Sequence, residues 1–163
     1  RDDAAAGHIG PEDRQQKRPA DWLPAGTVTE SGPTTDQRWI PVLKTCDVAP
    51  DTGMAVKIGT FQLAVFNFKS RGQWYACQNM CPHRADMVLA RGLLGETGGV
   101  PKIACPMHKK TFNLNDGQCL SGEPYRIQTY PIKVEDETVY VKLETKLSKD
   151  PIHVHEFHCA STA

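Results

Sequence analysis

The sequence predicts an all-β fold, an antiparallel β-sandwich or small barrel, and three observations support this prediction. Between residues 39 and 143 the chain carries many short segments that are rich in β-branched and aromatic residues. Polar turn sequences containing glycine, proline, asparagine or aspartate separate these segments at short intervals. No long amphipathic helical pattern interrupts the series. Many short strands with frequent turns are typical of sandwiches and small barrels.

The expected strands fall into two groups on either side of an unusual central region. The first group comprises residues 39–43, 54–58, 62–68 and 73–77, and the second comprises residues 102–105, 110–114, 125–135 and 138–143. The polar connector FKSRGQ, residues 68–73, suits a hairpin, and EDE, residues 135–137, is a tight link. GETGG, residues 95–99, is expected to form an exposed excursion.

Composition bounds the number of domains. The chain has 163 residues, of which 39% are hydrophobic, and this is enough apolar material for the core of one domain. We therefore expect a linker or mobile arm at residues 1–38, one domain at residues 39–145 and a C-terminal tail at residues 146–163. The chain begins with Arg1 rather than methionine, which suggests a piece of a longer polypeptide.

The charge balance argues against a nucleic acid or a membrane as partner. There are 19 basic and 19 acidic residues, so no excess of positive charge is available to neutralise phosphate groups or an anionic lipid surface. No apolar run approaches the roughly 18 residues that a membrane-spanning helix needs, and no secretory signal precedes the domain. These features predict a soluble, cytoplasmic protein.

Six cysteines in a chain of this length suggest either disulfides or metal binding. With no secretory signal and with a sufficient core, metal binding is the better expectation. Three cysteines, Cys46, Cys77 and Cys119, lie in or beside apolar strand-like segments, where an inert buried thiol is expected. We assign no function to these three.

Two short boxes in the central region combine a cysteine with a histidine. The first is CPH, with Cys81 and His83, and the second is CPMH, with Cys105 and His108. Each box therefore offers one thiolate and one imidazole. A structural zinc site with two ligands of each type is one solution. In zinc fingers, however, the two cysteines form one pair and the two histidines another, around a small helix. Boxes that each hold one cysteine and one histidine, and that lie between strands, also suit a binuclear cluster in which one iron binds both cysteines and the other binds both histidines.

The two boxes resemble those of the Rieske [2Fe–2S] domain family. The resemblance extends over roughly residues 39–145 and includes Phe112, the NDG turn at residues 115–117 and a terminal strand pair. It implies a Rieske-type antiparallel sandwich or small barrel in which two loops form a cluster-binding subdomain. The double box is far more specific than a single CxxC motif.

The resemblance also implies a ligand set. Cys81 and Cys105 would bind one iron of a [2Fe–2S] cluster, and His83 and His108 would bind the other, with their outer ring nitrogens near solvent. Two ferric ions, two sulfides, two thiolates and two neutral imidazoles sum to zero charge, whereas an all-thiolate cluster is more negative by two. Histidine ligation therefore makes the uptake of an electron easier.

Within the family, the residues of this chain indicate the low-potential, ferredoxin-like branch. High-potential respiratory members carry an extra cysteine in each box and a serine soon after the second histidine, whereas this chain has Asp86, Met107 and Lys110 at those positions. Arg84 and Lys109, together with Lys110, surround the expected ligands with positive charge, which suits an acidic partner.

Three longer stretches, residues 79–96, 101–123 and 130–143, resemble the small subunit of assimilatory NAD(P)H nitrite reductase, or the corresponding C-terminal domain of the fused fungal enzyme. This resemblance implies a catalytic partner, in cis or in trans, that carries FAD, a [4Fe–4S] cluster and sirohaem and reduces nitrite to ammonium. This chain has neither a GxGxxG fingerprint nor a four-cysteine set for those centres. We expect that it does not reduce nitrite alone.

Two alternatives remain open at this stage. One is the Rieske ferredoxin component of a ring-hydroxylating dioxygenase, which has the same boxes. The other is a structural zinc module with the same four ligands. A complete Rieske oxygenase would need a second domain, for which too few residues follow the second box. The tail does hold a histidine-rich stretch, which we interpret as disordered or as an adventitious metal binder: His153, His155, Glu156 and His158.

Overall fold

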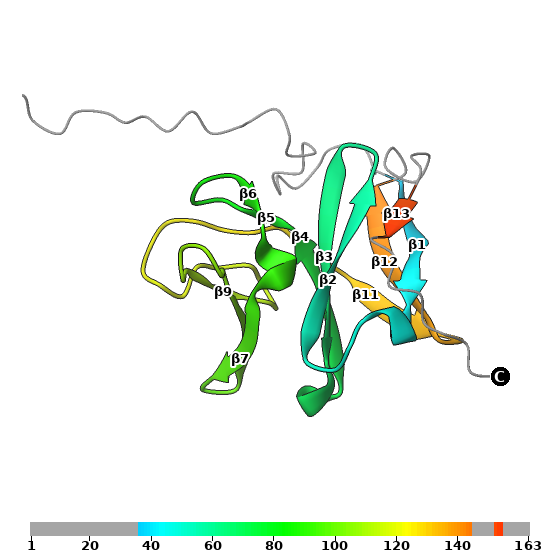
Figure 1. Cartoon of the computed structure of the whole chain (residues 1–163), viewed down its shortest axis with the longest axis horizontal. Helices are drawn as coiled ribbons and strands as arrows, with labels where there is room; N and C mark the ends of the chain where they lie inside the picture. Colours follow the sequence, from blue (N-terminus) through cyan, green and yellow to red (C-terminus); the bar gives the residue numbers. More distant parts are fainter. Residues whose placement is uncertain (1–35, 145–151, 155–163) are drawn as a thin grey trace, which may run out of the picture. The chain divides into compact units, whose positions relative to one another are not determined.

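The structure of this chain is a computed structural model that describes residues 36–144 and 152–154. Within these residues the regular structure consists of antiparallel strands and three short 3-10 turns (Figure 1), as the sequence predicts. The turns, η1, η2 and η3, span Thr45–Asp47, Lys69–Arg71 and Leu89–Arg91. No helix in the described part of the chain has the length and hydropathy to cross a membrane.

The largest sheet has five strands in the order β10-β4-β3-β2-β13. Its middle strand, β3, is buried along most of its length, which explains why its sequence FQLAVFNF reads as a nearly continuous apolar run. A two-residue turn at Gly59 and Thr60 joins β2 to β3, and η2 joins β3 to β4. The strands of this sheet are β2 (Thr52–Ile58), β3 (Phe61–Phe68), β4 (Gln73–Gln78), β10 (Thr129–Tyr130) and β13 (Ile152–Val154).

A second sheet has three strands in the order β1-β12-β11. In β12 the buried side chains alternate with partly exposed ones, as expected for a strand with one face on the core. Pro41 is tolerated in β1 because β1 is an edge strand and a register shift follows at this position. The strands are β1 (Gln37–Lys44), β11 (Ile132–Glu135) and β12 (Thr138–Glu144).

Two small sheets carry the cysteine-histidine boxes. In Figure 1 they lie on one side of strands β2 to β4, and the β1-β12-β11 sheet lies on the other side. The tip of the β7–β8 hairpin is held against η2, because Arg71 contacts Glu96 and donates to the carbonyl oxygen of Gly99 at 3.0 Å. The strands are β5 (Met80–Cys81) with β6 (Asp86–Met87), and β7 (Leu93–Thr97) with β8 (Val100–Ala104) and β9 (Thr111–Asn113).

One expected strand is divided in the structure. Residues 125–135, predicted as one strand, give β10 and β11, which belong to different sheets. The break falls at Pro131, which lacks an N–H group and cannot continue a ladder on its donor side. The carbonyl oxygen of Pro131 still accepts a hydrogen bond from the backbone N–H of Lys142. The chain therefore changes sheets at the residue that is least able to extend either of them.

Other differences lie between the two boxes and at the C-terminal end. Strands β5, β6 and β7 and the turn η3 occupy positions at which the sequence analysis predicted no strand. GETGG is an exposed hairpin tip, as expected, but it closes the β7–β8 hairpin. Ile152–Val154, within the predicted tail, forms β13 on β2. The proposed boundaries at residues 38 and 145 stay predictions, since residues 1–35, 145–151 and 155–163 lie outside the described part.

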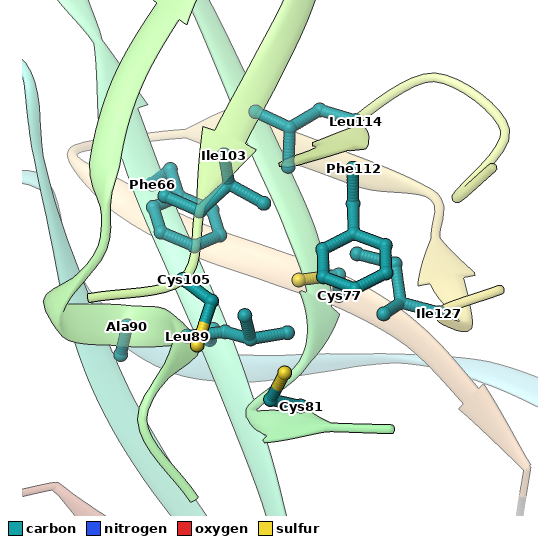
Figure 2. Packing of buried hydrophobic residues seen from close by; sticks show 11 residues of the cluster. Phe66, Cys77, Cys81, Leu89, Ala90, Ile103, Cys105, Phe112, Leu114 and Ile127 are labelled. Atoms are coloured by element: carbon teal, nitrogen blue, oxygen red, sulfur yellow. The ribbon is translucent and has the colours of Figure 1, made fainter. Parts of the chain in front are cut away.

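A buried cluster of side chains connects the five-stranded sheet to the two boxes (Figure 2). Phe66 of β3, Ile103 of β8 and Phe112 of β9 are fully buried there. The sulfur atoms of Cys81 and Cys105 lie beside Leu89 in the same cluster. The remaining labelled members are Cys77, Ala90, Leu114 and Ile127. The thiols of the boxes are therefore part of the hydrophobic core rather than of the surface.

Candidate metal centre

The two boxes form loops with the same backbone geometry. Cys81 ends β5 and Cys105 follows β8, and a proline comes after each of them. Four residues later, Ala85 and Lys109 have φ angles of 59° and 54°. Each of these two residues donates its backbone N–H to the carbonyl oxygen of its cysteine, at 2.9 Å in both loops. Each loop is thus closed on its own cysteine, which fixes where the side chains between them point.

The loops bring the side chains of both boxes together. The ligand atoms of Cys81, Cys105 and His108 all lie within 4.8 Å of one another. Within the second box, the Sγ atom of Cys105 lies 3.7 Å from Nδ1 of His108. The imidazole rings of His83 and His108 are neighbours, with their centroids 4.6 Å apart and their planes tilted by 53°. His83 is not one of this group of three.

His83 has a buried nitrogen that nothing in the described protein satisfies. Its Nδ1 atom is inaccessible to solvent and has no hydrogen-bond partner. A buried polar atom without a partner is costly unless a ligand completes it. The ring is held in place by Tyr125, which it meets edge to face at 5.9 Å between centroids and 87° between planes. The donor set and this unsatisfied nitrogen fit a bound metal group.

The outer nitrogen of His108 faces a carboxylate. Its Nε2 atom lies 3.7 Å from Oδ2 of Asp86, and the exposed fraction of the His108 side chain is 14%. Both outer nitrogens were expected near solvent, and for His108 the structure adds a carboxylate beside this nitrogen. The cause is the β5–β6 pairing, which sets Asp86 directly opposite Cys81. Sequence reasoning missed this role of Asp86 because the two-residue strands that create the pairing have no periodic pattern.

The Cys81 thiol is held in its protonated form when no metal is bound. Cys81 is 0% exposed and Cys105 is 1% exposed. Burial raises the pKa of the Cys81 thiol to about 12, and the neighbouring Cys105 and Asp86 act in the same direction. A metal that binds there must displace the thiol proton, because the thiolate is the ligand.

Two buried amide side chains anchor the first loop at its base. Asn79 receives the backbone N–H groups of Val88 and Leu89 on its carbonyl oxygen, and its side chain accepts the N–H of Ala90 at 2.8 Å. The Nδ2 group of Asn79 donates to Gln62. The neighbouring side chain of Gln78 also binds backbone, at Met80 and Gln128. Sequence reasoning did not identify either amide, since buried and exposed asparagines look alike in a sequence.

The positive charge around the site is smaller than the sequence suggests. Lys110 forms an ion pair with Glu123 at 2.5 Å, so its charge is largely neutralised within the protein. Arg84 and Lys109 are exposed. Met107, between the two ligands of the second box, is 65% exposed. The surface beside the candidate centre therefore combines two cations with an apolar side chain.

Among the described cysteines, Cys46, Cys77 and Cys119 do not join this group. Cys77 is fully buried and Cys119 is half-buried, but Cys46 is exposed, which differs from the expectation of a buried thiol. The difference arises because Cys46 lies on the 3-10 turn η1 and not on a strand. In the histidine-rich tail, His153 lies in β13 and pairs with Lys57, while His155, Glu156 and His158 fall outside the described residues.

Comparison with known proteins gives relatives of two kinds. The chain is 36% identical over 143 residues to nitrite reductase [NAD(P)H] of Emericella nidulans, covering 81% of this chain but only 13% of that enzyme. It is 32% identical over 105 residues to the nitrite reductase (NADH) small subunit of Escherichia coli K12, covering 64% of this chain and 97% of the subunit. A ferredoxin component of naphthalene 1,2-dioxygenase/salicylate 5-hydroxylase systems from Ralstonia is 29% identical over 109 residues, covering 66% of this chain and 98% of that protein.

A solved structure shows the same fold. The NMR structure of the Escherichia coli protein NirD matches with a TM-score of 0.60 and 31% identity, covering 66% of this chain and 98% of that chain. The model of the Rieske-like [2Fe-2S] domain matches residues 38–142, which include both boxes. From the sequence match and the paired loops together, this chain belongs to the Rieske-like [2Fe–2S] domain family.

Proposed function

We propose that this chain is the electron-transfer domain of an assimilatory NAD(P)H-dependent nitrite reductase, in the low-potential branch of the family. The observation that carries the proposal is that two buried thiols and two neighbouring imidazoles lie on two loops of equal geometry. When bound, a Rieske-type cluster accepts and returns one electron. The nitrite reductases among the relatives supply the reaction in which this electron would be used.

We assign Cys81 and Cys105 to one iron and His83 and His108 to the other. The burial of both thiols and the partnerless Nδ1 of His83 support this assignment. A set of two thiols and two imidazoles is also the combination that separates Rieske centres from all-cysteine clusters. Asp86, Met107 and Lys110, which stand where high-potential members have other residues, support the low-potential branch.

The residues around the site exclude water and fix its geometry. Leu89, Ile103 and Phe112 pack around the thiols within the core cluster. Asn79 holds the base of the first loop, and the two left-handed residues close both loops. A rigid, partly dry surrounding reduces the rearrangement that accompanies a change of charge at the site. Arg84 and Lys109 offer a docking surface for an acidic partner.

The partner in this proposal is the catalytic part of nitrite reductase, which would carry FAD, a [4Fe–4S] cluster and sirohaem. This chain spans 13% of the fungal relative and 97% of the bacterial small subunit, so the partner is joined in cis or bound in trans. We propose a cytoplasmic location, because NAD(P)H, the reductant in the names of these relatives, is an intracellular cofactor.

The first experiment identifies the metal. Purified protein is analysed for iron, zinc and acid-labile sulfide, and its electron paramagnetic resonance spectrum is recorded after anaerobic reduction with dithionite. We expect equal amounts of iron and sulfide and a rhombic signal whose mean g value lies below that of all-thiolate clusters. Stoichiometric zinc in a colourless protein with a silent spectrum would establish a structural zinc module instead.

Variants then test the four ligands. Cys81→Ser and His108→Ala should yield colourless protein, because each removes a ligand that the other residues cannot replace. Cys46→Ser and Cys119→Ser are matched controls, since these thiols lie outside the candidate centre, and both should keep the cluster. Full retention of iron and sulfide in Cys81→Ser would refute the ligand assignment.

A further comparison separates nitrite reductase from the dioxygenase ferredoxin. The 29% identity to the Ralstonia ferredoxin component, over 98% of its length, is the observation that favours this second function. The reduced domain is mixed in turn with a nitrite reductase large subunit and with a ring-hydroxylating oxygenase, and its reoxidation is followed. We expect faster reoxidation by the nitrite reductase, with no nitrite consumed by the domain alone.

A further inference from the structure

The two histidines of the candidate centre have different surroundings. His83 meets the edge of Tyr125, an uncharged ring, at 5.9 Å between centroids. His108 instead points its outer Nε2 at Asp86, with 3.7 Å between Nε2 and Oδ2. The 3.7 Å separation exceeds that of a direct hydrogen bond. One of the two imidazoles therefore has a negative charge next to it, and the other has an aromatic neighbour.

The position of Asp86 is fixed by the backbone. Asp86 pairs with Cys81 across the β5–β6 ladder, and its carbonyl oxygen accepts the N–H of Val88 at 3.0 Å. Its side chain is 45% exposed. The same residue thus stands opposite one candidate ligand, Cys81, and beside another, His108.

We propose that Asp86 is a positioning residue that orients the His108 ring and lowers the reduction potential of the centre. A carboxylate behind a metal-bound histidine fixes the orientation of the ring and makes it a stronger donor. The negative charge also repels the additional electron of the reduced state. Both effects favour the oxidised state. This inference rests on the proposed function, because it requires that His108 is an iron ligand.

The two lysines of the second loop are either paired or exposed. Lys110, the cation of the second loop with a half-buried side chain, is paired with Glu123. Arg84 and Lys109 are exposed to solvent, where screening weakens their influence. Asp86 lies beside a candidate ligand, His108, whereas the pairs Arg71–Glu96, Lys110–Glu123 and Lys133–Glu135 include none of the four candidate ligands.

The test is a redox titration of the intact chain, followed by the cluster signal in electron paramagnetic resonance at neutral pH. Asp86→Asn removes the charge and keeps the shape, so its midpoint potential should rise. Asp86→Glu keeps the charge, and its potential should stay nearer that of the unaltered protein. Glu135→Gln is the matched control, because it removes a carboxylate from β11, in the other three-stranded sheet, and should leave the potential unchanged.

The g values of the variants and their cluster content complete the test. The g values of Asp86→Asn should shift, because the ring of His108 loses its charged partner, whereas those of Glu135→Gln should not. An unchanged or lower potential in Asp86→Asn, with the cluster present, would overturn the inference while leaving the proposed function intact.

If Asp86→Asn does not assemble the cluster, Asp86→Ser is used as the neutral variant instead. Loss of the cluster in both neutral variants, with retention in Asp86→Glu, would overturn the inference. It would show that Asp86 is needed to assemble the cluster rather than to set its reduction potential. Absence of a cluster in the unaltered protein would instead refute the proposed function.

Discussion

Ala85 and Lys109 are structural equivalents, although they lie in different loops and have different side chains. Both come four residues after a cysteine of the candidate centre, and both have left-handed backbone angles, with φ of 59° and 54°. Both donate their N–H groups to the carbonyl oxygen of that cysteine. The two boxes thus form the same type of turn. The histidine comes two residues after the cysteine in the first box and three residues after it in the second.

Substitutions at Ala85 should test how strongly this turn holds the centre. Ala85→Val should lower the free energy of unfolding by about 1–3 kcal/mol, because a β-branched residue is strained at positive φ. Lys109→Gly should raise it by about 0.5–1 kcal/mol, as glycine adopts this conformation freely. Urea denaturation measures both values, and iron content reports on the loop. Equal stability of Ala85→Val and the unaltered chain would show that the turn can relax.

Asn79 should be required for the stability of the first loop. Asn79→Ala leaves the buried N–H of Ala90 without its 2.8 Å partner and should cost about 1–3 kcal/mol in unfolding free energy. It should also accelerate loss of iron during dialysis against a chelator. Asn67→Ala is the control, since Asn67 makes one hydrogen bond to Val48, away from both loops. A chelator-resistant Asn79→Ala would show that the loop is held by its ligands alone.

Gly117, in the NDG turn after β9, should tolerate no side chain. Its φ is +80°, and a Cβ atom there would lie 1.9 Å from the carbonyl oxygen of Ile127, which belongs to the core cluster. Gly122 has the same φ of +80° with open space around it. Gly122→Ala should therefore cost about 1 kcal/mol for backbone strain alone, and Gly117→Ala clearly more. Similar urea midpoints for the two variants would contradict this.

Asp51 should make part of the stability dependent on pH. The backbone N–H and the hydroxyl group of Ser70 both bind its carboxylate, at 3.0 and 2.9 Å, and they hold the pKa of Asp51 below its usual range. The unfolded chain therefore takes up a proton at higher pH than the folded one. The resulting stability is present above the ordinary carboxyl pKa of about 3.9 and is lost as the pH falls through the lower, folded pKa.

The matching experiment compares the unaltered chain with Asp51→Asn, since asparagine also accepts the left-handed backbone at this position, where φ is 55°. The unaltered chain should be the more stable at pH 7, and the difference should shrink below about pH 4. Urea denaturation across this range measures it. A difference that grows as the pH falls would contradict the shift.

The sequence predicts those strands whose pattern is created by the core. TVYVKL, residues 138–143, alternates because one face of β12 packs inward, and FQLAVFNF reads as apolar because β3 is the middle strand. The β5–β6 pair cannot be predicted in this way, because two-residue strands have no period. Pro131 was visible in the sequence, but the change of sheet that it permits depends on β4 and β12, which lie far away along the chain.

In the candidate site, too, the residues set by local sequence could be predicted and those brought in by packing could not. Four ligand positions can be proposed from the spacing of two boxes, because local turns fix the relation of each cysteine to its histidine. Residues that contact the site from other segments have no characteristic spacing in the sequence. Asp86 reaches His108 through strand pairing, and Tyr125 reaches His83 from a loop that follows β9. Contacts between separate segments are decided by packing, which a single sequence does not display.

The position of β13 has a consequence for where this chain can be shortened. Ile152–Val154 pairs with residues 56–58 of β2 and so covers that edge of the five-stranded sheet. A chain that stops at residue 145 would contain both boxes but would leave the N–H and C=O groups of β2 open to another molecule. Such an edge favours pairing between copies. We expect the shortened protein to self-associate with rising concentration in sedimentation experiments, while its metal content stays the same.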